Sequence, residues 1–207
     1  MMRKMMLITL LCMLSGTAQA HEVWVERDGA GAARIYLGEP ADPLPAGGDP
    51  EFEKLKAPTV LGQEKPTFTR RAGFLEAAVP SGDVRVWDDN VFAPWGAEGS
   101  KEGVVYYARA GRTEARTLLP LEIAPVVPNS NRFALLRDGK PVANTKVTII
   151  SPDKWSRSVL TGAQGDFEVP VREQGRYLLT AAVKDEGQAG QPVGTMHRIT
   201  TTTFTSN

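Results

Sequence analysis

Apolar and polar residues alternate in short runs along most of this chain, and this pattern predicts β-strands. In residues 22–26, EVWVE, the pleat of a strand places Val23 and Val25 on one face and Trp24 on the other. Other runs are rich in β-branched and aromatic residues and are bounded by Gly, Pro or Asn, which is typical of strands. They cover 32–38, 67–79 (two strands around Ala72-Gly73), 103–110 and 116–125.

The composition changes at 123–131, IAPVVPNSN, where prolines and asparagines predict a linker. Beyond it, strand-like runs recur with short turns between them, at 132–137, 145–151, 156–161, 167–171 and 175–183. Asp138-Gly139 supplies residues that tolerate the positive φ of a tight hairpin turn. This spacing predicts an antiparallel sandwich. We therefore expect an all-β protein of two β-rich parts, an N-terminal domain over 21–125 and a sandwich over 126–207, whose C-terminal strand returns toward the N-terminal domain.

Two long stretches lack a strand pattern. Residues 38–63 are rich in Pro and Gly, with a short helix expected near Phe52 to Leu55, and residues 88–103 are the other irregular stretch. Loops of this length in compact domains often carry function.

The first twenty residues have the three parts of a secretory signal. Arg3 and Lys4 precede an apolar run, Met5 to Leu14, which is too short for a permanent transmembrane helix. Ala18-Gln19-Ala20 then offers small residues to a signal peptidase. We predict cleavage after Ala20, a periplasmic location and no membrane span in the mature protein. Leu11 before Cys12 argues against lipidation.

Composition narrows the function classes further. Removal of 20 of the 207 residues leaves 187 and takes away the single cysteine, so the mature protein has no disulfide. Its stability must come from a conventional core, which this length allows. The 24 basic and 24 acidic residues balance and form no basic stripe, which argues against nucleic acid as a partner.

The C-terminal part carries the sequence LRDGKPVANTKVTIISPD, followed by TGAQGDFEVPV and GRYLLTAAV. This order of segments resembles the prealbumin-like or carboxypeptidase-regulatory-like β-sandwich. The resemblance implies a fold and says little about function, because such modules are often scaffolds.

Four further landmarks extend over the mature chain. They are His21-Glu22-Val23-Trp24 after the signal, IYLGE at 35–39, LPLEIAP at 119–125 and MHRITTTTF at 196–204. In this order they resemble a family of exported bacterial proteins, many labelled as a domain of unknown function and others as periplasmic components of cobalt or nickel uptake. The resemblance implies metal handling, with an inner-membrane metal transporter as partner.

The two histidines are the candidate metal ligands. Cleavage after Ala20 would free the α-amine of His21, which can chelate one metal ion together with its own Nδ1. An imidazole nitrogen from His197 would complete a three-nitrogen site that resembles a histidine brace. Such ligands suit Cu(II) and Ni(II), and cobalt is the other metal that the family resemblance implies. A solvated terminal histidine and an exposed strand histidine remain the simpler alternatives.

Other candidates have weaker support. Glu22 and Glu39 could accept a hydrogen bond from an imidazole or bind the metal, although solvated surface carboxylates are the commoner case. Met196 points away from His197 on a strand and is expected to pack rather than bind copper. Asp88-Asp89 beside Asn90 is typical of a turn. The serines, Ser81, Ser151 and Ser156, have no nucleophile context, so we expect no enzyme.

Three functions follow, in order of support. The first is exported, non-catalytic binding of nickel, cobalt or copper by His21 and His197. The second is a structural or adhesive module that binds a protein or polysaccharide through loop 88–103, where Trp87, Phe92 and Trp95 could stack on a sugar or cap the core. The third is a copper oxidase that uses the histidine brace.

Overall fold

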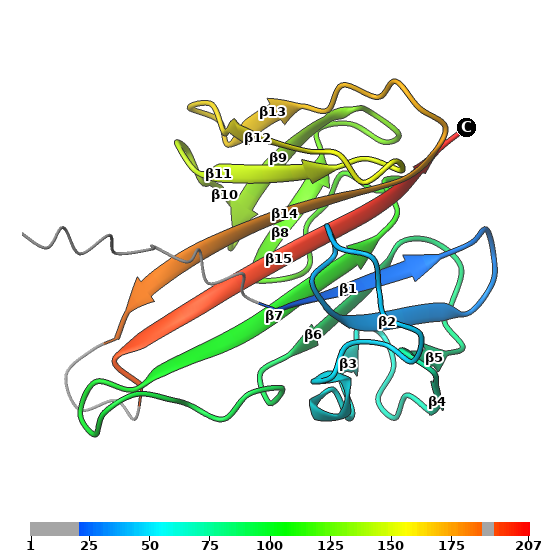
Figure 1. Ribbon diagram of the computed structural model, residues 1–207. Coiled ribbons are helices and arrows are strands. Elements are labelled where there is room, and N and C mark those ends of the chain that lie inside the picture. The colour runs from blue at the N-terminus through cyan, green and yellow to red at the C-terminus, as the bar shows by residue number, and fades with distance from the viewer. Residues whose placement is uncertain (1–20, 188–192) are drawn as a thin grey trace, which may run out of the picture.

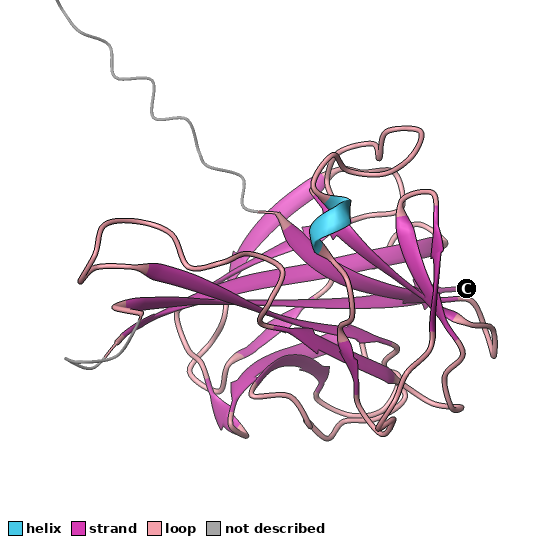
Figure 2. Ribbon diagram, turned by 90° about the horizontal axis from the view of Figure 1, so that it is seen from below, coloured by secondary structure: helices cyan, strands magenta, loops and turns pink. Residues whose placement is uncertain are grey.

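The computed structural model describes residues 21–187 and 193–207 (Figure 1). The predicted signal, residues 1–20, and its cleavage site lie outside the described residues. The regular secondary structure of the described chain is almost entirely β-strand, and the exception is one short 3₁₀ turn, η1, at Phe52–Lys54 where a short helix was expected (Figure 2). This confirms the all-β fold class. Within the described ranges, no helix is both long and apolar enough to span a membrane.

Fifteen strands are described. Their bounds are β1 Glu22–Arg27, β2 Ala33–Gly38, β3 Thr59–Val60, β4 Phe68–Arg71, β5 Phe74–Ala77, β6 Val84–Asp88, β7 Glu102–Ala110, β8 Leu121–Pro125, β9 Arg132–Arg137, β10 Lys140–Pro141, β11 Lys146–Ile150, β12 Ser156–Leu160, β13 Asp166–Glu168, β14 Gly175–Glu186 and β15 Thr195–Ser206.

The strands form three sheets. A seven-stranded sheet has the order β12-β11-β14-β15-β7-β6-β3, and its long strands run side by side across the molecule (Figure 1). One face of this sheet carries the four-stranded sheet β1-β2-β5-β4, and the other carries β10-β9-β13 with β8 paired to β9. All pairs are antiparallel except β15 with β7.

Strand β7 contributes to two cores. Val104, Tyr106 and Ala108 pack with β1, β2 and β5, whereas Val105 and Tyr107 pack with β8, β9 and β14. Because both faces are covered, its sequence GVVYYARA is a nearly continuous apolar run instead of an alternating one. Val23 and Val25 lie in the first of these cores, and Trp24 packs on the opposite side with Ile150 and Leu178, as the alternation of β1 predicts.

Strand β15 joins the two predicted parts of the chain. It pairs with β14 from the C-terminal part and with β7 from the N-terminal part. The hydroxyls of Thr201 and Thr203 donate to the carbonyls of Val23 and Val25 in β1, at 2.8 and 2.6 Å. The seven-stranded sheet therefore crosses the predicted boundary at 125/126, and the division into two domains stays a prediction.

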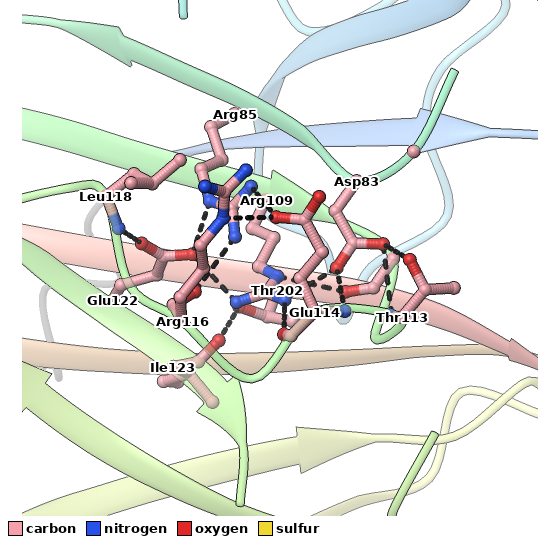
Figure 3. A network of polar contacts seen from close by, with 12 residues as sticks. Asp83, Arg85, Arg109, Thr113, Glu114, Arg116, Leu118, Glu122, Ile123 and Thr202 are labelled. Carbon is pink, nitrogen blue, oxygen red and sulfur yellow. Dashed lines mark hydrogen bonds and ion pairs between the residues drawn. The ribbon is translucent and has the colours of Figure 1, made fainter. Parts of the chain in front are cut away.

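Strand β6 was missing from the sequence prediction, because a charged residue, Arg85, interrupts its apolar residues. Arg85 and Arg109 are buried and both donate to Glu122 Oε1 at 2.8 Å, and Asp83 accepts from Arg109 at 2.6 Å (Figure 3). Glu122 Oε2 accepts the backbone N–H groups of residues 118 and 119. This network fastens β8 to β6 and β7. The sequence predicts a strand from residue 116, but β8 begins only at Leu121. The N–H groups of residues 118 and 119 bond to the Glu122 side chain instead of to a neighbouring strand.

Candidate functional site

His21 lies immediately before β1, and its imidazole faces two carboxylates. Nε2 is 3.1 Å from Asp49 Oδ1, and Nδ1 is 3.7 Å from Glu51 Oε2. The side chain of His21 is 26% exposed and that of Asp49 is 13% exposed, so the contact is partly shielded from water. In the tautomer that donates its Nε2–H to Asp49, Nδ1 carries the lone pair and faces Glu51.

The loop before η1 brings these carboxylates to His21. Gly48 has φ 93° and lies against Gly73 in the β4–β5 turn, so closely that a Cβ on Gly48 would be 2.3 Å from the Gly73 Cα. Only two glycines allow this approach. Asp49 then turns the chain into η1, and its Oδ1 accepts the backbone N–H of Glu51 at 2.7 Å. The fold of this loop therefore sets both carboxylates relative to the imidazole.

The carboxylate of Glu51 contacts both Lys54 and His21. Its Oε1 is 2.5 Å from Lys54 Nζ, while Oε2 faces His21. Lys54 Nζ also lies 4.5 Å from the centre of the Phe92 ring, and that ring is 6.0 Å from the His21 ring. Phe92 thus packs against both His21 and Lys54 and limits access of water to this side of the imidazole.

Glu22 is not the solvated carboxylate that the sequence favoured. Its Oε2 is buried and has no hydrogen-bond partner among the described residues. Burial, with a smaller contribution from the charge of Glu39, raises the pKa of Glu22 to about 7, although a hydrogen bond with Thr180 lowers it. The expectation fails because β1 is covered on both faces, so this carboxyl oxygen is enclosed although the residue as a whole is only partly buried.

The surroundings of His21 are strongly acidic. Burial raises the pKa of the Tyr106 hydroxyl, and the charges of Glu22, Glu51 and Asp88 raise it further. Partial desolvation and Asp42 raise the pKa of Glu39, which also feels the charge of His21. A cation placed beside His21 would therefore be stabilised by several carboxylates at short range.

His197 lies on β15, between Lys184 of β14 and Val104 of β7. Its Nε2 is 2.5 Å from Glu102 Oε2, and its ring stacks on Trp95 with 5.9 Å between ring centres. The hydrogen bond with His197 lowers the pKa of Glu102. Met196 points to the other face and packs against the second core, as expected for a packing residue.

The two histidines lie at different positions along neighbouring strands and have different carboxylate partners. The bonds from Thr201 to Val23 and from Thr203 to Val25 set the alignment of β15 with β1. His21 lies two residues before Val23, and His197 lies four before Thr201. At about 3.3 Å per residue, His197 is therefore offset from His21 by about 7 Å along the strands. A single ion shared by both imidazoles stays a prediction.

The remaining candidates have structural roles. Asp88 Oδ1 accepts the N–H of Asn90 at 2.7 Å, the turn that the sequence predicts. Trp87 packs against the second core and Phe92 against the first. Trp95 differs, because it is 44% exposed and its backbone pairs with Glu102. Sequence reasoning missed Asp49, Glu51 and Lys54, for which the only local signal was an acidic segment after Gly47-Gly48.

No family model, curated protein or solved structure matches this chain. Within 21–187 and 193–207, side chains of His, Cys, Asp and Glu form no group of three or more arranged to hold a metal ion. The arrangement at His21 instead provides one imidazole with a carboxylate facing each ring nitrogen, to which cleavage after Ala20 would add an α-amine.

Proposed function

We propose that this protein is an exported, non-catalytic binder of a transition metal, nickel, cobalt or copper, at the N-terminus created by removal of residues 1–20. The observation that carries the proposal is the pairing of His21 Nδ1 with Glu51 Oε2 at 3.7 Å. A metal ion bonded to both atoms at about 2 Å would need only a small closure of this gap. This short separation supports the proposal that the two groups hold a small divalent ion.

Each group near His21 has a distinct part in the proposal. The α-amine and Nδ1 of His21 would chelate the ion, and Glu51 would supply an oxygen ligand. Asp49 would hold the Nε2–H and so orient the ring, as carboxylates commonly do for metal-bound imidazoles. Lys54 already neutralises the other oxygen of Glu51. Periplasmic delivery to an inner-membrane metal transporter is part of the proposal and is supported by the family resemblance alone.

The test uses protein that begins at His21, titrated with Ni(II), Co(II) and Cu(II) by calorimetry. We expect one-to-one binding that is micromolar or tighter and that follows the usual order, with Cu(II) highest. His21→Ala, or a serine placed before His21, should abolish it, because each removes part of the chelate. Asp49→Asn should weaken binding by about tenfold or more.

Controls separate the ligands from general electrostatics. Glu64→Gln removes an exposed carboxylate outside this cluster and should leave the affinity unchanged. Glu51→Gln should weaken binding if its oxygen is a ligand. His197→Ala decides whether the second imidazole shares the ion. Equal affinity of the native protein and the form with a preceding serine would rule out the proposed site.

A second candidate rests on Trp95. This exposed indole is held in place by stacking on His197 and by backbone pairing with Glu102, so it offers a fixed aromatic surface. Such a surface suits the face of a sugar ring or an apolar side chain of a partner protein. If loop 88–103 is the binding site, Trp95→Ala should abolish polysaccharide or protein binding while metals have no effect on it.

A further inference from the structure

A cleft lies at the end of the molecule opposite His21. There β1 ends at Arg27, β7 ends at Ala110 and β15 reaches Ser206, because these three strands run in the same direction. The chain segments that follow β1 and β7, together with the last residues of β15 and with Arg176, line a cleft of about 610 Å³. The chain end marked C in Figure 1 lies at this cleft.

Arg112 is a half-buried cation that lacks a carboxylate partner in the cleft. Its guanidinium lies 4.5 Å from the centre of the Phe204 ring and donates to the side-chain oxygen of Asn131. None of the ion pairs among the described residues involves Arg112, and residues 1–20 and 188–192 contain no Asp or Glu. Burial lowers the pKa of Arg112, as expected when no anion offsets the cost of desolvation.

Arg27 adds a second positive charge without an acidic partner in the described chain. Its four hydrogen bonds go to the backbone carbonyls of residues 30, 31, 80 and 82. These bonds hold the guanidinium rigidly beside the cleft and leave its charge uncompensated. A fixed cation at the wall of a cleft attracts anions over a distance of about a Debye length.

The two side-chain carboxylates of the cleft are already bonded to arginines. Asp28 accepts from Arg34 and Arg176, and Asp83 accepts from Arg109 and from the hydroxyl of Thr113. Arginine pairing lowers the pKa of Asp28 and of Asp83 against the opposing effect of burial, so both stay ionised and occupied. Among the side chains of the cleft, the positive charge that remains comes from Arg27 and Arg112, and no ion pair of the described residues joins either to the terminal carboxylate of Asn207.

We propose that this cleft binds a small molecule through an oxyanion, a carboxylate or a phosphate, which Arg112 holds with its free N–H groups and Arg27 attracts. A planar guanidinium with several unused donors matches the geometry of either oxyanion. The volume exceeds that of a single phosphate, so an organic phosphate or a polycarboxylate fits the cleft better than an inorganic ion. This site is independent of the metal proposal.

Calorimetry with glycerol 3-phosphate and with citrate, at constant ionic strength, tests the proposal. The protein carries a short Gly-Ser extension after Asn207, which moves the terminal carboxylate away from the cleft. We expect one-to-one binding of at least one probe. The probe that binds shows whether the cleft prefers a phosphate or a carboxylate. Arg112→Gln should weaken binding by about tenfold or more, the usual effect of losing a charge-assisted hydrogen bond.

The matched control is Arg157→Gln, which removes an exposed arginine of β12 outside the cleft and should leave binding unchanged. If Arg112→Gln fails to fold, Arg112→Lys keeps the charge but loses the planar fork, and it should still weaken binding. Failure of both probes to bind the parent protein overturns the proposal. So does equal binding by the parent and the folded Arg112 variant.

Discussion

Glu122 is the residue whose loss should destabilise this protein most clearly. The carboxylate has no exposed surface and accepts hydrogen bonds from Arg85, Arg109 and two backbone N–H groups. Glu122→Ala would leave both guanidinium groups buried beside an empty space. We expect it to lower the free energy of unfolding by about 3–5 kcal/mol, the usual cost of breaking a buried ion pair by removing one partner.

Urea denaturation measures this change, with Glu64→Ala as the exposed control, which should change stability by less than about 0.5 kcal/mol. A similar small effect for both variants would show that the arginines find other partners when Glu122 is missing.

Glu22 should make stability depend on pH. Its pKa is about 7 in the folded protein against 4.5 as the ordinary value, so the folded state holds an extra proton between these pH values. The free energy of unfolding should therefore fall as pH rises from about 4.5 through 7, by about 3 kcal/mol in total. Glu22→Gln keeps the shape without the charge and should remove this loss, which makes it more stable than the parent at pH 8.

The comparison is made by urea denaturation at pH 5 and pH 8. A Gly-Ser dipeptide precedes His21 in both proteins, so that no α-amine adds a charge beside Glu22. Parallel pH profiles of the parent and of Glu22→Gln would contradict the prediction.

At the scale of elements, β15 offers a matched pair of threonines. Thr202 donates to the Ile123 carbonyl at 2.7 Å, whereas the hydroxyl of Thr200, two residues earlier on the same face, is buried without a partner in the described structure. Thr202→Val should lower the free energy of unfolding by about 1–3 kcal/mol, because a buried carbonyl loses its donor. Thr200→Val should be neutral or stabilising. Thermal or urea denaturation of both variants checks the difference, and equal effects would contradict it.

The sequence predicted correctly the strands in which apolar and polar residues alternate, and the turns whose residues tolerate a positive φ. The alternation of β1, the buried positions Val147 and Ile149 of β11, and the Asp138-Gly139 turn with φ of 47° and 75° all follow from it. It failed for β6, where Arg85 interrupts the apolar pattern. Such a strand is buried only because Glu122 and Glu114 reach it from elsewhere in the chain.

At the scale of the whole molecule, the seven-stranded sheet should make unfolding cooperative. Its strands come from both sides of residue 125, and β15 lies between β14 and β7. We expect a single transition, with secondary structure by far-UV circular dichroism and tertiary packing by near-UV signals lost together. Two separate transitions would show that 21–125 and 126–207 are independent domains.

The sequence by itself determined the all-β class, most strands and the scarcity of histidine, because these depend on local composition and on the two-residue period of a strand. Only the tertiary structure decided what surrounds His21. Asp49 is 28 residues away in the chain, and it reaches the imidazole because Gly48 and Gly73 pack backbone against backbone. The same is true of the cleft at Arg112 and of the buried charge at Glu22. Whether a charged side chain is paired, buried or exposed depends on which distant segment of the chain packs against it. The local sequence pattern does not contain that information.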